Sequence, residues 1–170
     1  MGQVSVVYGV ILGLEWKIAD RGYLQRLNQT AIEQLPKTDD WPFLTRSLFS
    51  IAGDTPETGH YRRQCIHFGA SFKGLEWEWD RWLVKFESLL SQLFWDEVLL
   101  HLYTEAVGHY DYQYKAIYPL SFYNEMRPIP SQEWQFAGGP RVFDEEAKWV
   151  EECEQTWQYL YGQWQLASLD

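Results

Sequence analysis

An amphipathic pattern over 75–95 constrains the fold more than any other feature of the sequence. Large apolar side chains recur there at steps of three or four residues, which is the spacing of one face of an α-helix. These side chains are Leu75, Trp79, Trp82, Phe86, Leu90 and Leu93. Trp77 falls on the opposite side and is a candidate exposed aromatic residue. A helix with this many rings on one face has to bury them against another apolar layer, and the flanking segments have the pattern of strands.

Five segments are predicted to be β-strands. Residues 4–12 are almost continuously apolar and rich in valine, which is typical of a central strand. Apolar residues alternate with others along 62–72, and also along 97–105 and 109–117, which form the clearest hairpin. Segment 44–52 supplies the remaining strand.

Two further helices and one long loop complete the chain. Residues 24–35 carry leucines and an alanine at helical spacing, with Asp20 as a possible N-cap. A broad apolar stripe predicts another helix over 144–164, capped by Asp144. Between the hairpin and this helix, 118–140 contains four prolines and a Gly-Gly pair and has no lasting periodicity. It is predicted to be an irregular aromatic loop.

The resulting order is β-α-β-β-α-β-β-α, and a short internal repeat supports it. Gly13-Leu14-Glu15-Trp16 returns as Gly74-Leu75-Glu76-Trp77, each time after a strand and before a helix. Two split β-α-β halves give this order. The predicted fold is therefore α+β, with a single domain over 1–170. Its mainly antiparallel five-stranded sheet has the strand order 5-4-1-3-2, with the helices packed on one face.

A register of the hairpin centred on Val107 gives its two faces different characters. It places the tyrosines of 109–117 on the core side, beside 98–102. The opposite face carries a polar patch. In this register His101 faces Gln113, Tyr103 faces Asp111 and Glu105 faces His109. The patch consists of His101, Tyr103, Glu105, His109 and Asp111. Imidazoles and carboxylates can bind a metal ion or transfer protons, but the same pattern also fits an ordinary half-solvated sheet face. Because only a pair or two of ligands converges in this register, no metal and no cofactor is predicted.

Catalytic motifs are missing from the sequence. It contains no P-loop, GxGxxG, GxSxG or HExxH pattern. Cys65 and His67 share one strand face, but no third group completes a nucleophilic site. Cys153 lies on the apolar stripe of 144–164 and is expected in the core. No catalytic residue is predicted, and the protein is not expected to be an enzyme.

The net charge of −10 is confined to the second half of the chain. Residues 1–85 hold ten acidic and ten basic side chains, whereas 86–170 hold fourteen acidic and four basic ones. An acidic surface of this kind excludes direct binding to the phosphates of nucleic acids, because the charges repel each other. It suits either a basic protein partner or the simpler role of a solvated, solubilising surface.

Other bulk features indicate the compartment. Ten tryptophans, eleven tyrosines and nine phenylalanines exclude intrinsic disorder. No apolar run reaches the length of a membrane-spanning helix, no signal peptide is expected, and the sequence contains no CxxC pair. A reduced cytoplasmic protein that does not bind membranes is the simplest interpretation.

Aromatic residues exceed what one core of this size needs. Tryptophan, tyrosine and arginine are favoured at the centres of protein interfaces. Several aromatic residues outside the apolar stripes lie near carboxylates in the sequence, and together they are candidates for binding a partner. The candidates are Trp77, Tyr123, Glu125, Glu133, Trp134, Phe136, Glu151, Glu152 and Glu154.

Two stretches give the chain a family resemblance. At His67-Phe68-Gly69-Ala70-Ser71-Phe72-Lys73-Gly74, running into Trp82-Leu83-Val84-Lys85-Phe86-Glu87-Ser88-Leu89-Leu90, it looks like bacterial open reading frames. In general character it resembles the immunity proteins of polymorphic-toxin and contact-dependent inhibition systems, which are small, acidic, cytoplasmic and free of catalytic motifs. The resemblance implies a toxin inhibitor and implies neither an architecture nor any residue's role.

These features lead to three hypotheses for the function. The first is an immunity or antitoxin-type inhibitor that binds a cognate, basic toxin domain. The second is an enzyme or small-ligand module that uses His101, His109 and Asp111 on the polar sheet face, under the loop 118–140. The third is a structural subunit of a larger assembly. The sequence does not specify an oligomeric state.

Overall fold

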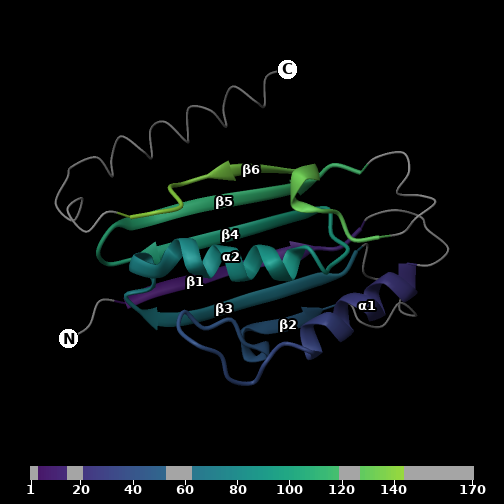
Figure 1. Ribbon diagram of the computed structural model, residues 1–170, viewed down its shortest axis with the longest axis horizontal. Coiled ribbons are helices and arrows are strands. Elements are labelled where there is room, and N and C mark those ends of the chain that lie inside the picture. The colour runs from purple at the N-terminus through teal and green to yellow at the C-terminus, as the bar shows by residue number, and fades with distance from the viewer. Residues whose placement is uncertain (1–3, 15–20, 53–62, 119–126, 144–170) are drawn as a thin grey trace, which may run out of the picture.

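The computed structural model describes residues 4–14, 21–52, 63–118 and 127–143, which form an antiparallel sheet with two α-helices (Figure 1). Short 3₁₀ turns precede β2, α2 and β6. The elements are β1 (Val4–Leu12), α1 (Arg21–Glu33), η1 (Arg46–Leu48), β2 (Phe49–Ala52), β3 (Cys65–Lys73), η3 (Leu75–Glu78), α2 (Trp79–Leu90), β4 (Glu97–Thr104), β5 (Gly108–Ala116), η4 (Ser131–Glu133) and β6 (Trp134–Gly138).

The sheet order is β2-β3-β1-β4-β5-β6, and every neighbouring pair is antiparallel. The first four strands and the two helices form two interleaved split β-α-β units, as the β-α-β-β-α-β order predicts. The predicted α+β class, the antiparallel sheet and the order 5-4-1-3-2 are confirmed within this arrangement. The number of strands was wrong, because a sixth strand extends the sheet beyond β5. The helix predicted over 144–164 lies outside the described residues.

The sixth strand lies where the sequence predicted only an irregular loop. β6 pairs with β5 so that Phe136 faces Tyr114 and Trp134 faces Ala116. Both rings pack on tyrosine or tryptophan side chains of the helix-covered face, with centroids of Phe136 and Tyr114 4.9 Å apart. The alternation is only five residues long and stands among prolines, so periodicity alone could not separate this strand from the surrounding loop.

Helix α2 covers one face of the sheet. In Figure 1 it crosses in front of β1 and β4. All six apolar residues predicted for its stripe are buried, and Val84 on the opposite side is 61% exposed. The α-helix itself ends at Leu90, earlier than the predicted boundary at residue 95. Its last turn tightens, because the N–H groups of Gln92 and Leu93 donate to carbonyls only three residues back.

The second copy of the repeated motif ties this helix to β1. Gly74 adopts a left-handed conformation, with φ of 70°, between β3 and the 3₁₀ turn. The next two residues are buried, and the N–H of Leu75 donates to Ser5 Oγ over 3.0 Å. That hydroxyl in turn donates to the carboxylate of Glu76. The side chain of Trp77 is half-buried and lies against Gly74. The corresponding Glu15 and Trp16 of the first copy lie outside the described residues.

The strand predicted over 44–52 is shorter than expected: β2 begins only at Phe49, and the residues before it form a loop and a 3₁₀ turn. Asp39 Oδ2 accepts the N–H of Leu44 over 3.0 Å and the ammonium of Lys85 over 2.7 Å. Although burial opposes this, the hydrogen bonds from Lys85 and from the backbone hold the pKa of Asp39 below its ordinary value. The Lys85 ammonium also donates to the carbonyls of Asp40 and Pro42. These contacts keep the chain away from the sheet until β2 begins at Phe49.

Helix α1 packs through leucines and an isoleucine, and it also buries one polar residue. Asn28 is 2% exposed and lies between Leu24 and Ile32 on the buried side of the helix. Its amide nitrogen donates to the carbonyl of Phe94 over 2.8 Å, and its oxygen accepts the N–H of Phe94 over 2.7 Å. A further bond of 3.1 Å reaches the side chain of Gln64. Asn28 therefore satisfies the backbone of Phe94 where water is excluded.

Replacing Asn28 with alanine is expected to destabilise the protein by about 2–3 kcal/mol, because the buried N–H and C=O of Phe94 lose their partner. Urea denaturation measures this loss as a lower transition midpoint. Thr30→Ala on the exposed side of the same helix is the control and should stay within about 0.5 kcal/mol of the parent. Alanine raises helix propensity at both positions, so propensity cannot cause a loss in either variant. Equal losses in the two variants would therefore contradict the role given to the Phe94 bonds.

Within the described residues, no helix is both long enough and apolar enough to span a membrane.

Candidate polar site on the open sheet face

The face of the sheet opposite α2 carries the candidate site. Tyr103 faces His109 and His101 faces Asp111 across the β4–β5 hairpin. This register is centred on Ala106 rather than on Val107. Three expected pairs were therefore wrong: His101 with Gln113, Tyr103 with Asp111, and Glu105 with His109. Each residue's partner shifts by two positions, which keeps every side chain on its predicted face. The tyrosines of β5 therefore lie on the core side as predicted, with Tyr112 and Tyr114 buried.

The turn explains this register. Thr104 pairs with Gly108, whose φ of 97° suits glycine, and the three residues between them form the loop. Thr104 Oγ1 accepts the N–H of Val107 over 2.8 Å and closes the turn. Glu105 is in the loop, and its carboxylate accepts the backbone N–H of Val4 over 3.1 Å. Glu105 thus binds the start of β1 instead of joining the histidine pair.

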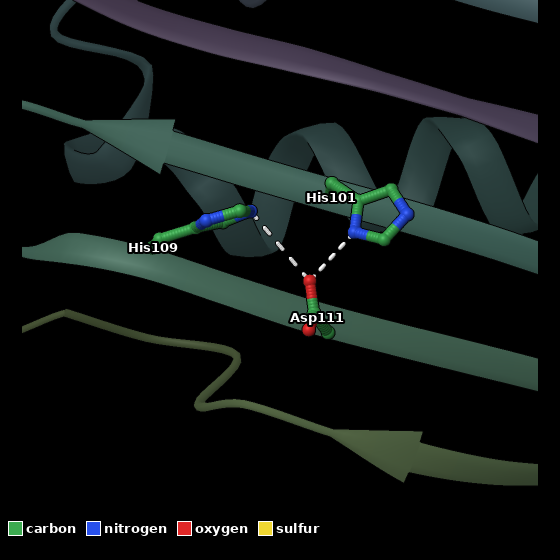
Figure 2. A group of neighbouring side chains, drawn as sticks. All are labelled: His101, His109 and Asp111. Atoms are coloured by element: carbon green, nitrogen blue, oxygen red, sulfur yellow. Dashed lines mark hydrogen bonds and ion pairs between the residues drawn. The ribbon is translucent and has the colours of Figure 1, made fainter. Parts of the chain in front are cut away.

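Two imidazoles converge on one carboxylate at the centre of this face. Figure 2 shows His101 from β4 and His109 from β5 directed toward the same oxygen of Asp111, with α2 on the far side of the sheet. His101 Nδ1 is 2.6 Å from Asp111 Oδ1, and His109 Nε2 is 3.6 Å from the same atom. The three side chains belong to adjacent strands and are held by the hairpin register.

Aromatic rings surround this group. The Tyr8 ring of β1 stacks on His101, with centroids 4.8 Å apart and planes 21° apart. Its hydroxyl lies 3.4 Å from His109 Nε2. The Tyr103 ring meets His109 edge-on at 6.1 Å. Tyr8 was not among the predicted site residues. The predicted sheet order, which places β1 beside β4, was the signal that could have found it, since these two strands pair Tyr8 with His101.

The site is reachable from solvent. The side chains of His101 and His109 are 32% and 30% exposed, and that of Asp111 is 49% exposed. Tyr8 and Tyr103 are among the most exposed aromatic residues described. Two nitrogen donors and a carboxylate that are partly exposed and mutually close can coordinate a cation or hydrogen-bond a polar ligand.

The helix-covered side holds a second polar cluster, which is structural. The guanidinium of Arg141 forms a paired contact with the carboxylate of Glu87, with nitrogen–oxygen distances of 2.6 and 2.9 Å. The hydroxyl of Tyr114 donates to the same carboxylate over 3.0 Å. The hydrogen bonds that Arg141 donates to Glu87 raise its pKa, and burial raises the pKa of Tyr114. This cluster joins α2 to the segment that follows β6.

The predicted partner-binding residues are scattered in the structure. Trp134 is half-buried in the core, where its indole N–H donates to the carbonyl of Ile129. Glu133 is half-buried and pairs with Arg127 at 3.4 Å. Phe136 is 40% exposed, under the guanidinium of Arg141. The remaining candidates lie outside the described residues: Tyr123, Glu125, Glu151, Glu152 and Glu154.

The two cysteines do not form a described site. Cys65 is a half-buried free thiol at the start of β3, two residues from the exposed His67. Cys153 lies outside the described residues.

Comparison of the chain with protein-family models, with curated proteins and with solved structures gives no match.

Proposed function

We propose that the protein is an immunity or antitoxin-type inhibitor, which binds a cognate basic toxin domain and blocks its active site. The observation that carries this proposal is the distribution of unbalanced negative charge. It is supported by the surplus of aromatic residues and by the general character shared with immunity proteins.

Three of the six described carboxylates of the second half pair with arginines within the protein. Asp96 lies 3.8 Å from Arg63, and the carboxylates of Glu87 and Glu133 also contact arginines. These groups contribute less net field than their number suggests, because each is offset at short range. We therefore assign these carboxylates to stabilising the fold rather than to binding a partner.

The excess charge lies further along the chain. Residues 144–170 contain seven acidic side chains and one basic side chain, a net charge of −6 within the total of −10. A concentration of charge of one sign speeds encounter with a partner of the opposite sign and favours that partner over others. Nucleases and other toxins that bind nucleic acid present basic surfaces, so they match this charge.

The test uses the toxin domain encoded by the reading frame adjacent to this one. The inhibitor should protect cells that express the toxin domain, and the purified proteins should bind with an affinity that falls as salt rises. Reversing Glu151, Glu152 and Glu154 to lysine should weaken binding at least about tenfold and flatten its salt dependence, because the steering charge is removed. Calorimetry at two or more salt concentrations measures both effects.

A matched control changes the net charge equally elsewhere. The triple variant of Glu33, Asp40 and Glu57 to lysine alters the balanced first half and should bind almost like the parent. Equal weakening by both triple variants would show that only the overall charge matters. Failure of the parent protein either to bind or to protect would refute the inhibitor function itself.

A further inference from the structure

We propose that His101, His109 and Asp111 form a binding site for one divalent transition-metal ion, of which Zn²⁺ suits the donors best. This inference is independent of the toxin-binding proposal, which depends on residues 144–170. The site lies on the open sheet face between β4 and β5 (Figure 2).

The donor set selects the class of ion. Two imidazole nitrogens and one carboxylate oxygen are the ligands that zinc and neighbouring transition metals take. Calcium and magnesium prefer six or more oxygen ligands, and a single carboxylate between two imidazoles does not offer them. The sequence prediction of no metal assumed that at most a pair or two of ligands converges, whereas the observed register brings three together.

The distances fit with a small adjustment. One ligand atom from each of the three side chains lies within 4.8 Å of the others. Donors bound to a tetrahedral zinc ion are separated by roughly 3.3–3.6 Å, given bonds of about 2.0–2.2 Å. The 3.6 Å between His109 Nε2 and Asp111 Oδ1 already matches this separation. The 2.6 Å between His101 Nδ1 and Asp111 Oδ1 is a hydrogen bond, which the ion would replace after these atoms separate by up to about 1 Å. The most widely separated donors would have to approach each other by up to about 1.2 Å.

The surroundings limit how far the imidazoles can move. The stacked Tyr8 ring fixes the plane of His101, while Tyr8 and Tyr103 flank His109. All of these residues belong to paired strands, which hold ligands more accurately than loops do. Three protein ligands leave the fourth tetrahedral position open, and the half-exposed Asp111 shows that water or a small anionic ligand can reach it.

The test is titration of the untagged full-length protein with Zn²⁺ in an isothermal calorimeter. We expect one ion per chain, and at least about tenfold weaker binding in His109→Gln and in Asp111→Asn. Both substitutions are at partly exposed positions, so the variants should keep the far-ultraviolet circular dichroism of the parent. Binding of Co²⁺ should produce visible absorption typical of a tetrahedral nitrogen and oxygen site, without a thiolate charge-transfer band.

Two control variants separate this site from donors of β3 on the same face. His67→Gln and Cys65→Ser remove donors from β3 and leave the proposed ligands intact. They should bind Zn²⁺ as tightly as the parent. The proposal is overturned if folded parent protein binds no Zn²⁺, or if binding survives unchanged in both His109→Gln and Asp111→Asn. It is equally overturned if the β3 variants are the ones that lose the ion.

Discussion

Replacing Gly9 with alanine is expected to abolish the cooperative native fold. Gly9 lies at the middle of β1, the strand between β3 and β4, where the Phe68 ring covers it. A Cβ atom at this position would overlap the carbonyl oxygen of Leu99 and lie 2.6 Å from Phe68 Cζ. The Leu99 oxygen belongs to the backbone of a paired strand, so it cannot move aside without breaking the ladder. We expect a loss of at least about 4 kcal/mol, which urea denaturation and near-ultraviolet circular dichroism would detect.

Gly69→Ala provides a control in the neighbouring strand. Gly69 faces the open side of β3, and the nearest atoms to an added Cβ are 3.5 Å away, an ordinary contact distance. This variant should be neutral or stabilised by up to about 1 kcal/mol, because alanine restricts the unfolded chain. If Gly69→Ala were as damaging as Gly9→Ala, close approach of the strands would not be the cause.

Truncating Trp82 to alanine is expected to cost about 3–5 kcal/mol of stability. Trp82 is completely buried and stacks between Trp79, at a centroid distance of 5.2 Å, and Phe86, at 5.1 Å. Its indole N–H also donates to the carbonyl of Phe43 over 3.1 Å, which holds the loop before β2 against α2. The substitution therefore leaves a cavity and an unpaired carbonyl together. Thermal and urea denaturation would both show the loss.

Two variants of the same helix separate these contributions. Trp82→Phe keeps a ring in the stack and removes the N–H, so its loss should be clearly smaller than that of the alanine variant. Val84→Ala on the exposed side should change stability by no more than about 0.5 kcal/mol. A large effect at Val84 would mean that this side of α2 is buried in solution.

The sequence predicted the sheet and the helix that covers it better than the pairing of individual strands. The apolar stripe from Leu75 to Leu93 and the alternation in β3, β4 and β5 are strong periodic signals, because burial acts on every turn or every second residue. They were sufficient to predict helix α2 and an antiparallel sheet beside it. Short elements without a sustained period, such as β6, depend on tertiary pairing and carry little local signal.

In the candidate site, the sequence predicted the face of each side chain but not its partner on the neighbouring strand. Alternation placed His101, His109 and Asp111 on one face correctly, since a strand fixes the face of each side chain. It could not fix which residues are opposite each other. That depended on a three-residue turn closed by Thr104 and on the positive φ of Gly108. Tyr8 was missed because its neighbour in space, His101, is 93 residues away in sequence, and only the sheet order brings the two together.

The alternation along β4 and β5 has a consequence for how this protein can change over time. Leu100, Leu102 and Tyr112 face the helices, whereas their immediate neighbours His101, Tyr103 and Asp111 face outward. Outward residues can therefore be exchanged for others without altering the volume enclosed beneath them. One unchanged scaffold can in this way present many different recognition chemistries, and a lineage can acquire a new ligand while its folding remains the same.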